Sequence, residues 1–271
     1  MNNNAIQIIN DEIYKTSYKR EVSKKDIPVC DILGVQIAAI NMTWLVKYLL
    51  TNLEGLSGDY LCVSNVHTTV LAFHDEKYRK VQNGGIMAIP DGGPLSSLGR
   101  RRGYSSMERT TGPELMQEIF ELSDKEKNYR HYFYGSTPQT LEKLESELKR
   151  RYPNLKIAGM YSPPFRKLTQ EEDIEVVERI NKTKPDFVWI GLGAPKQEIW
   201  MAKHQGLVKG LMLGVGAGFD YHAGNRKRAP QWMQRMNLEW LYRLLQDPKR
   251  LFKRYLYTNT SFIWNAVIRG R

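Results

Sequence analysis

Short apolar runs and longer stretches of helical periodicity alternate along most of the chain. The apolar runs have the length of strands, and the longer stretches repeat apolar positions every three or four residues, as Leu141, Leu144 and Leu148 do. This alternation predicts strands at 60–64, 86–89, 131–134, 155–160, 186–190 and 211–215. The helices predicted between them cover 69–81, 113–122, 138–151, 169–182 and 195–204.

The first fifty or so residues carry a different pattern. Residues 1–25 are polar and charged, and we expect a flexible extension there. Two short apolar runs, 27–33 and 35–39, flank Gly34 and predict a β-hairpin. Asn41 or Thr43 is suited to cap a helix that runs to about Leu53.

Strands that alternate with helices are typical of a parallel sheet covered on both faces. We therefore expect an α/β, Rossmann-like fold, with a mostly parallel sheet and helices on both faces. A small N-terminal β-hairpin and a helical C-terminal appendage complete it. The expected division is a flexible extension at 1–25, a Rossmann-like domain at 26–223 and the appendage at 224–271.

Small and polar residues gather where the predicted strands end. Ligands of parallel sheets bind beyond the carboxyl ends of the strands, so this edge is the expected binding site. A Gly-x-Gly turn between strand and helix suits a diphosphate held by backbone N–H groups, and a tight turn alone is the other interpretation. The residues expected at this edge are Asn65, Asp91, Gly135, Tyr161, Gly191, Gly193 and Gly216.

The glycine turns lack the dinucleotide-binding fingerprint. Its third glycine is replaced by Lys196 in one turn and by Phe219 in the other. A nicotinamide-dependent enzyme is therefore disfavoured.

Asp91 is the candidate general base. It follows an apolar strand and lies between Pro90 and two glycines, so little bulk surrounds its carboxylate. Such a carboxylate can take the proton from an attacking hydroxyl group. An Asp-Gly turn without a chemical role is the alternative interpretation.

Three further side chains near these turns suit phosphate or sugar. Arg109 precedes a predicted helix and could neutralise a phosphate, although the residues alone favour a surface ion pair with Glu108 or Glu114. Lys196 and Gln197 open the helix after a glycine turn and could contact a diphosphate and a sugar hydroxyl. Ordinary helix-start chemistry is the other interpretation of that segment.

We expect neither a metal nor a cofactor. No predicted strand end carries an Asp-x-Asp pair, and His67 and His74 alone are too few ligands for a metal site. Cationic side chains must then offset the negative charge that develops on a leaving group.

The net charge of +11 is concentrated in the appendage. Residues 224–271 hold 11 Lys and Arg against 2 Asp and Glu, whereas the preceding residues hold 29 against 27. Such a basic segment indicates an anionic partner: a phospholipid surface, a nucleic acid or a phosphorylated substrate.

Aromatic residues accompany the charges of the appendage, and Pro248 divides it into at least two predicted helices. The spacing of Arg243, Arg250 and Arg254 predicts that they share roughly one helical face. Aromatic rings beside basic residues suit the headgroup region of a membrane. A solvated amphipathic helix and a single-strand nucleic-acid surface are the alternatives.

The sequence favours a cytoplasmic protein. Its two cysteines form no disulfide framework, and the N-terminus lacks the apolar core of a signal peptide. The longest mostly apolar stretch, 207–219, is too short to span a bilayer, which needs about 20 apolar residues. A soluble or peripheral location is expected.

Four ordered blocks resemble the WecG/TagA/CpsF family of bacterial glycosyltransferases, and the resemblance covers about 29–255. The blocks are Gly191-Leu-Gly-Ala-Pro-Lys-Gln-Glu198, Gly214-Val-Gly-Ala-Gly-Phe-Asp220, Lys227-Arg-Ala-Pro-Gln-Trp-Met233 and Leu238-Glu-Trp-Leu-Tyr-Arg-Leu-Leu245.

The resemblance implies an inverting, metal-independent transferase that moves a sugar from a UDP-sugar to a polyprenyl-diphosphate-linked saccharide. It implies a peripheral location on the inner face of the cell membrane and products such as teichoic acid, capsule or exopolysaccharide. A nucleic acid is then not an expected partner, and a homo-oligomer is left open.

The same resemblance assigns roles to individual residues. Asp91 corresponds to the base, Arg109 to the phosphate-binding arginine and Gln197 to the active-site glutamine. Asn65 and Asp220 correspond to donor-binding positions, and Tyr161 to a ring that stacks on uracil. The appendage arginines of the acceptor and diphosphate site correspond to Arg243, Arg250 and either Arg254 or Lys253.

Two positions depart from the family pattern. Val63 stands where some members have threonine, and His67 stands where others have an acidic residue. The donor sugar is therefore left open between an N-acetylmannosamine type and a hexose. Two functions from other classes also stay open: a nucleic-acid-binding protein that uses the basic appendage, and a nucleotide-binding regulator without catalysis.

Overall fold

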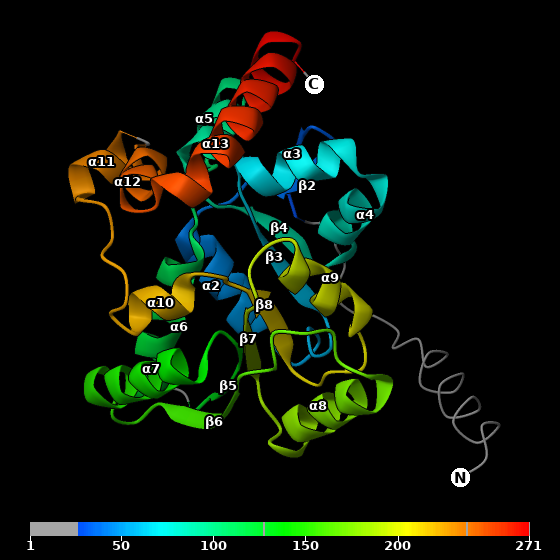
Figure 1. The fold of residues 1–271 in the computed structure, drawn as a ribbon, viewed down its shortest axis with the longest axis vertical. Coiled ribbons are helices and arrows are strands. Elements are labelled where there is room, and N and C mark those ends of the chain that lie inside the picture. Colours follow the sequence, from blue (N-terminus) through cyan, green and yellow to red (C-terminus); the bar gives the residue numbers. More distant parts are fainter. Residues whose placement is uncertain (1–26, 127, 237, 271) are drawn as a thin grey trace, which may run out of the picture.

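Eight strands form one sheet in the computed structural model, which describes residues 27–126, 128–236 and 238–270 (Figure 1). Their order is β1-β2-β4-β3-β8-β7-β5-β6, and only the β1–β2 pair is antiparallel. The predicted Rossmann-like α/β fold is confirmed, and the hairpin forms one edge of the main sheet. The strands are β1 Val29–Ile32, β2 Val35–Ala38, β3 Tyr60–Ser64, β4 Met87–Pro90, β5 Arg130–Gly135, β6 Lys156–Tyr161, β7 Phe187–Gly191 and β8 Leu211–Gly214.

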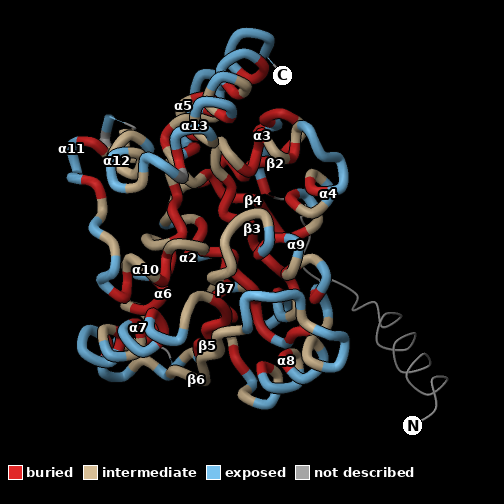
Figure 2. Tube along the Cα trace, in the orientation of Figure 1, coloured by how far each residue is buried: buried red, intermediate tan, exposed pale blue. Residues whose placement is uncertain are grey.

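Alternating side chains of the central strands supply two hydrophobic cores, one on each face of the sheet. Phe133 and Trp189 belong to one core, whereas Tyr134 and Ile190 belong to the other. Because helices cover both faces, the central strands are buried along nearly their whole length (Figure 2). The first core is covered by α2 Met42–Thr51, α6 Gly112–Lys125, α7 Pro138–Arg151 and α10 Gly218–His222, and the second by α3 Val66–His74, α4 Glu76–Gly84, α5 Gly93–Arg101, α8 Gln170–Lys182 and α9 Lys196–Lys203.

Capping residues in the sequence correctly indicated where several helices begin. Asn41 caps α2 by accepting from the Trp44 backbone N–H at 2.8 Å. Thr169 and Glu172 form a reciprocal capping box at the start of α8. The predicted extension at 1–25 lies outside the described residues.

Two helix predictions were wrong. The single helix expected at 69–81 is two helices, because Asp75 ends α3 in an extended conformation and its carboxylate caps α4 at Lys77 and Tyr78. Helix α5 was not predicted, because the glycines that open it resemble a turn. Gly92 takes a φ of +102°, and α5 begins at the next residue.

The appendage consists of α11 Gln231–Arg235, α12 Glu239–Gln246, α13 Pro248–Phe262 and a π-helical segment, Ile263–Ile268. The predicted break at Pro248 is confirmed. Helix α13 lies beside α3 (Figure 1), and Phe262 and Ala266 join the second core. The boundary between residues 223 and 224 stays a prediction.

The expectation of one arginine-bearing helical face was wrong. Arg243 lies in α12, whereas Arg250 and Arg254 lie in α13, and Asp247 ends one helix and begins the other. The side chain of Arg250 lies outside the described part of the structure. The regular spacing in the sequence therefore does not correspond to one continuous helix.

Candidate active site

Asp91 and Asn65 come together where two neighbouring parallel strands end. Asp91 follows β4, and its backbone N–H donates to the Ser64 carbonyl of β3 at 2.7 Å. The Asn65 oxygen accepts from the backbone N–H groups of His67 and Thr68, which caps α3, and the Asn65 side chain also hydrogen-bonds to the Asp91 carboxylate. Both residues therefore lie at the carboxyl edge of the sheet, as expected from their positions at strand ends.

The surroundings of Asp91 suit a general base. The pKa of its carboxyl group is raised to about 6, because burial and the negative charge of Glu239 outweigh the lowering by Arg243, Arg109 and the Asn65 hydrogen bond. A base of that pKa is ionised at neutral pH and still holds a transferred proton better than an ordinary aspartate.

Arg109 approaches the same place from the segment before α6. The neighbouring Thr110 N–H donates to the Pro90 carbonyl at 2.9 Å, which anchors this segment beside the end of β4. The Arg109 guanidinium donates to Glu114 at 2.6 Å and to Glu239 at 2.9 Å. The ion pair with Glu114 considered from the sequence is therefore present, and the arginine also lies close enough to Asp91 to affect its pKa.

Arg243 brings the appendage to the site. Its Nε donates to the Tyr221 hydroxyl at 3.1 Å, and its guanidinium lies over that ring, 5.6 Å from the centroid. Burial lowers the pKa of Arg243, but Tyr221, Asp91 and Glu239 raise it more, so the net shift is upward. Arg243 is therefore a permanent cation within electrostatic reach of Asp91.

Gln197 lies under the glycine turns with its side chain 4% exposed. Its oxygen accepts from the Gly193 N–H at 3.1 Å, and its nitrogen donates to Glu198 at 2.8 Å and to the Gly214 carbonyl at 3.0 Å. The amide thus ties the turn after β7 to the end of β8. A direct contact between Gln197 and a substrate stays a prediction.

The glycines at this edge of the sheet meet different structural demands. Gly135 has a φ of +122°, and a Cβ there would lie 2.6 Å from the Gly191 carbonyl carbon, so strand packing requires it. Gly193 has a φ of +77°, and a Cβ added there would have no atom within 4 Å. Gly216 has a φ of +52° and lies beside the Gln197 amide. Lys196 is exposed at the start of α9. Phosphate binding by this group stays a prediction.

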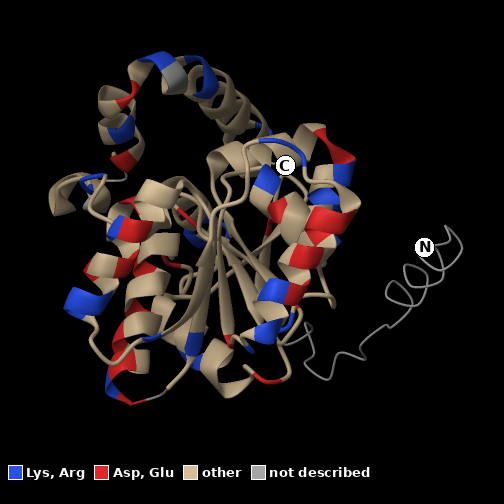
Figure 3. Ribbon diagram, turned by 60° about the horizontal axis from the view of Figure 1, so that its bottom comes forward, with Lys and Arg blue, Asp and Glu red and all other residues tan. Residues whose placement is uncertain are grey.

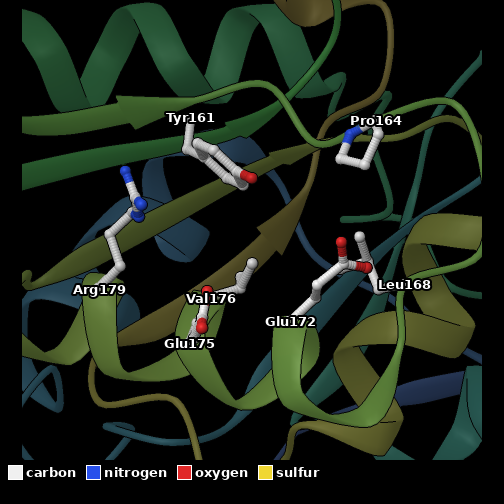
Figure 4. Close-up of a pocket in the computed structure, with 7 residues that line it drawn as sticks. All are labelled: Tyr161, Pro164, Leu168, Glu172, Glu175, Val176 and Arg179. Carbon is white, nitrogen blue, oxygen red and sulfur yellow. The ribbon is translucent and has the colours of Figure 1, made fainter.

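Tyr161 lies away from Asp91, because β6 is the far edge strand and four strands separate it from β4. The guanidinium of Arg179 covers its ring at 4.8 Å from the centroid. Stacking of Tyr161 on uracil stays a prediction. Figure 4 shows the shallow pocket beside it, which is lined by Tyr161, Pro164, Leu168, Glu172, Glu175, Val176 and Arg179.

Asp220 and His67 lie on helices that cover opposite faces of the sheet. Asp220 lies in α10 next to Tyr221, and its carboxylate is 3.6 Å from the Arg226 guanidinium. Burial and the positive charge of Arg254 together lower the pKa of His67 to about 4. The His67 Nδ1 and the Arg254 Nε are buried and have no hydrogen-bond partner within the described residues. His67 is thus a neutral ring at neutral pH and a weaker base than Asp91.

Glu239 is the residue of this site that sequence reasoning missed. Its carboxylate pairs with Arg109 at 2.9 Å and with Arg243 at 3.3 Å. Glu239 and Arg243 are four residues apart at the start of a helix, and this spacing could have indicated the ion pair between them. The contact with Arg109 has no local signal, because 130 residues separate the partners.

Two features are absent from the described part of the chain. No group of three or more His, Cys, Asp or Glu side chains there is arranged to hold a metal ion. No described helix is both long and apolar enough to cross a bilayer.

The carboxyl edge of this mostly parallel sheet combines a carboxylate of raised pKa with two arginines, an arrangement that suits an enzyme of the group-transfer class. The chain belongs to the glycosyl transferase WecG/TagA/CpsF family, whose model matches residues 30–271. It is therefore a glycosyltransferase, and the match runs through the whole appendage.

Curated relatives agree with this assignment. The chain is 32% identical over 218 residues to an N-acetylglucosaminyldiphosphoundecaprenol N-acetyl-beta-D-mannosaminyltransferase of Bacillus subtilis strain 168, covering 80% of this chain and 82% of the relative. It is 30% identical over 224 residues to a protein of the same name from Staphylococcus aureus strain MW2, covering 82% and 86%. The nucleic-acid-binding and regulatory alternatives are not favoured by these similarities.

Proposed function

We propose that this enzyme transfers N-acetylmannosamine from its UDP derivative to N-acetylglucosamine on a polyprenyl diphosphate, with inversion at the anomeric carbon. The names of the two relatives support the sugar and the acceptor. The observation that carries the proposal is the Asp91 carboxylate, with its pKa raised to about 6, within electrostatic reach of Arg109 and Arg243. The product would serve the synthesis of a cell-surface polysaccharide.

The chemistry follows from this arrangement. Asp91 takes the proton of the acceptor hydroxyl, whose oxygen attacks the anomeric carbon as the bond to the UDP oxygen breaks. The negative charge that develops on the UDP diphosphate is offset by Arg109 and Arg243, so we propose that transfer needs no metal ion. Asn65 holds the Asp91 carboxylate in place, and the glycine turns after β7 and β8 receive the nucleotide.

We further propose that the appendage lies on the inner face of the cell membrane. Figure 3 shows basic residues at the turn between α12 and α13, where Lys249 and Lys253 are exposed. Aromatic and aliphatic side chains are exposed on the same helices, an arrangement that suits anionic headgroups and the start of the acyl region. The exposed apolar residues of α13 and the following segment include Phe252, Leu256, Tyr257, Ile263, Trp264 and Ile268.

The test is a transfer assay with purified enzyme, a panel of UDP-sugars and a lipid-linked N-acetylglucosamine acceptor. We expect UDP-N-acetylmannosamine to be the preferred donor and the product to carry the inverted linkage by NMR. We expect the rate to be unchanged by EDTA. Transfer of a hexose in preference to N-acetylmannosamine would correct the donor, and no transfer from any UDP-sugar would refute the proposal.

A further inference from the structure

Glu239 lies at the centre of the contact between the appendage and the catalytic sheet. It occupies the first turn of α12, and its side chain is 19% exposed. One carboxylate oxygen accepts from Arg109 at 2.9 Å, and the other lies 3.3 Å from the Arg243 guanidinium. A single carboxylate therefore bridges the two arginines nearest to Asp91.

Glu114, the second carboxylate that pairs with Arg109, has further partners outside this pair. Glu114 lies in the first turn of α6, accepts from the Thr111 hydroxyl at 2.9 Å and pairs with Arg228 as well as Arg109. Those partners keep Glu114 in place if Arg109 turns to another anion. Within the described part of the chain, Glu239 by contrast pairs only with Arg109 and Arg243.

Charge balance makes Glu239 significant for substrate binding. With Asp91 ionised, three carboxylates face three guanidinium groups in this cluster, so no cation is in excess. A nucleotide diphosphate would add negative charge to a balanced and partly buried cluster, which is costly unless one carboxylate gives up its place. The cluster consists of Asp91, Glu114 and Glu239 with Arg109, Arg228 and Arg243.

We propose that Glu239 is a positioning residue that orients Arg109 and Arg243 beside Asp91 and occupies, between them, the place that the diphosphate of the donor takes on binding. The inference rests on the proposed function, because it requires these arginines to receive that diphosphate. A preorganised arginine pair lowers the cost of ordering two long side chains when the substrate arrives.

Glu239 also acts on the base through space. Asp91 faces Asn65, Arg109, Arg243 and Glu239, and among these only Glu239 adds to the rise in the Asp91 pKa that burial causes. Exchange of Glu239 for a neutral residue therefore lowers the pKa of Asp91. A residue that only held α12 in place would not have that effect.

The experiment compares wild-type enzyme with Glu239→Gln in UDP titration calorimetry and in the pH profile of kcat/KM. Because the competing anion is lost, we expect UDP to bind about 3- to 10-fold more tightly, with the gain shrinking as salt is added. We expect kcat to fall roughly 10-fold, because the arginines are less well oriented. The acid limb of the profile should move to lower pH.

Glu118→Gln is the matched control, because Glu118 is exposed on α6 and its exchange removes the same charge. It should leave all three measurements unchanged. Weaker or unchanged UDP binding by Glu239→Gln, or an acid limb that stays in place, would overturn the inference.

Glu239→Asp serves as the second variant and covers the case in which Glu239→Gln does not fold. It keeps the charge but is one methylene shorter, so it cannot span both arginines. We expect a lower kcat with the acid limb close to that of the wild type, and a wild-type kcat would contradict the positioning role. UDP titration needs no acceptor, so the inference is tested even if the transfer assay fails.

Discussion

Arg109 donates to Glu239 at 2.9 Å, and this ion pair joins residues 130 positions apart in the chain. Arg109 is anchored beside the end of β4, whereas Glu239 begins a helix of the appendage. The pair therefore attaches α12 to the catalytic edge of the sheet and brings Arg243 within electrostatic reach of Asp91. The basic appendage thus contributes Glu239 and Arg243 to the surroundings of Asp91, the proposed base.

Asp91→Asn should remove the general base while keeping the shape of the site. We expect kcat to fall by about 10²–10⁴-fold, with UDP binding kept within a few fold. Transfer assays and UDP calorimetry measure the two effects, and Glu142→Gln on the exposed face of α7 is the control. Turnover near the wild-type rate would show that another group takes the proton.

The pH profile of kcat/KM should show an acid limb near pH 6. Burial raises the Asp91 pKa to about 6, so activity should rise as the carboxylate ionises through that value. Loss of the limb in Asp91→Asn, measured on its residual activity, would assign it to this residue. A limb near pH 4 that persists in the variant would contradict the assignment.

The raised pKa of Asp91 also predicts how stability depends on pH. In the folded state the group binds its proton more tightly than in the unfolded chain, so its contribution to stability declines as pH rises from about 4 through 6. Asp91→Asn lacks this decline. We expect the variant to gain stability relative to the wild type between pH 4 and pH 8, by about 2–3 kcal/mol in denaturant titrations. An equal difference at both pH values would contradict the shifted pKa.

Arg109→Met should loosen α12 without unfolding the sheet. The substitution removes the hydrogen bonds to Glu239 and Gln234. We expect amide hydrogen exchange in α12 to quicken by roughly 10-fold, the equivalent of about 1–2 kcal/mol of local stability. Arg166→Met, which breaks an exposed pair with Glu172, is the matched control and should leave α12 unchanged.

Membrane binding should depend on exposed apolar side chains of the appendage. We expect a triple exchange of Phe252, Tyr257 and Trp264 to serine to weaken binding to phosphatidylglycerol vesicles by at least 10-fold in sedimentation assays, with little change in thermal stability. Phe165→Ser, at a side chain 88% exposed outside the appendage, is the control and should bind normally. Unchanged binding by the triple variant would refute the proposed surface.

Point exchanges are a better test here than removal of residues 224–271. Leu251 and Phe262 of α13 are buried, and Phe262 and Ala266 belong to the second core. Deletion of the appendage would therefore expose apolar surface of the sheet domain. A loss of activity after deletion would then have two causes, the missing Arg243 and the lower stability, which the experiment does not separate.

Local patterns in the sequence determined most of the elements of this protein. Periodicity, capping residues and β-branched runs act over a few neighbouring positions, so the strands and helices such as α7 and α8 could be predicted from them. The adjacency of Asn65 and Asp91 was also predictable, because parallel strand ends share one edge. Where two local signals competed, as at Asp75 and at Gly92-Gly93, the prediction failed.

Only the tertiary structure decided which charges meet at the site. The regular spacing of Arg243, Arg250 and Arg254 suggested one helical face, but the break at Asp247 assigns them to two helices. Glu239 was missed, and Gln197 proved to be buried beneath the glycine turns. Such contacts depend on how distant segments pack, and no short-range period in the chain encodes that packing. The sequence alone determined the α/β scaffold and indicated Asp91 as the candidate base, while the folded chain decided which charged side chains surround Asp91.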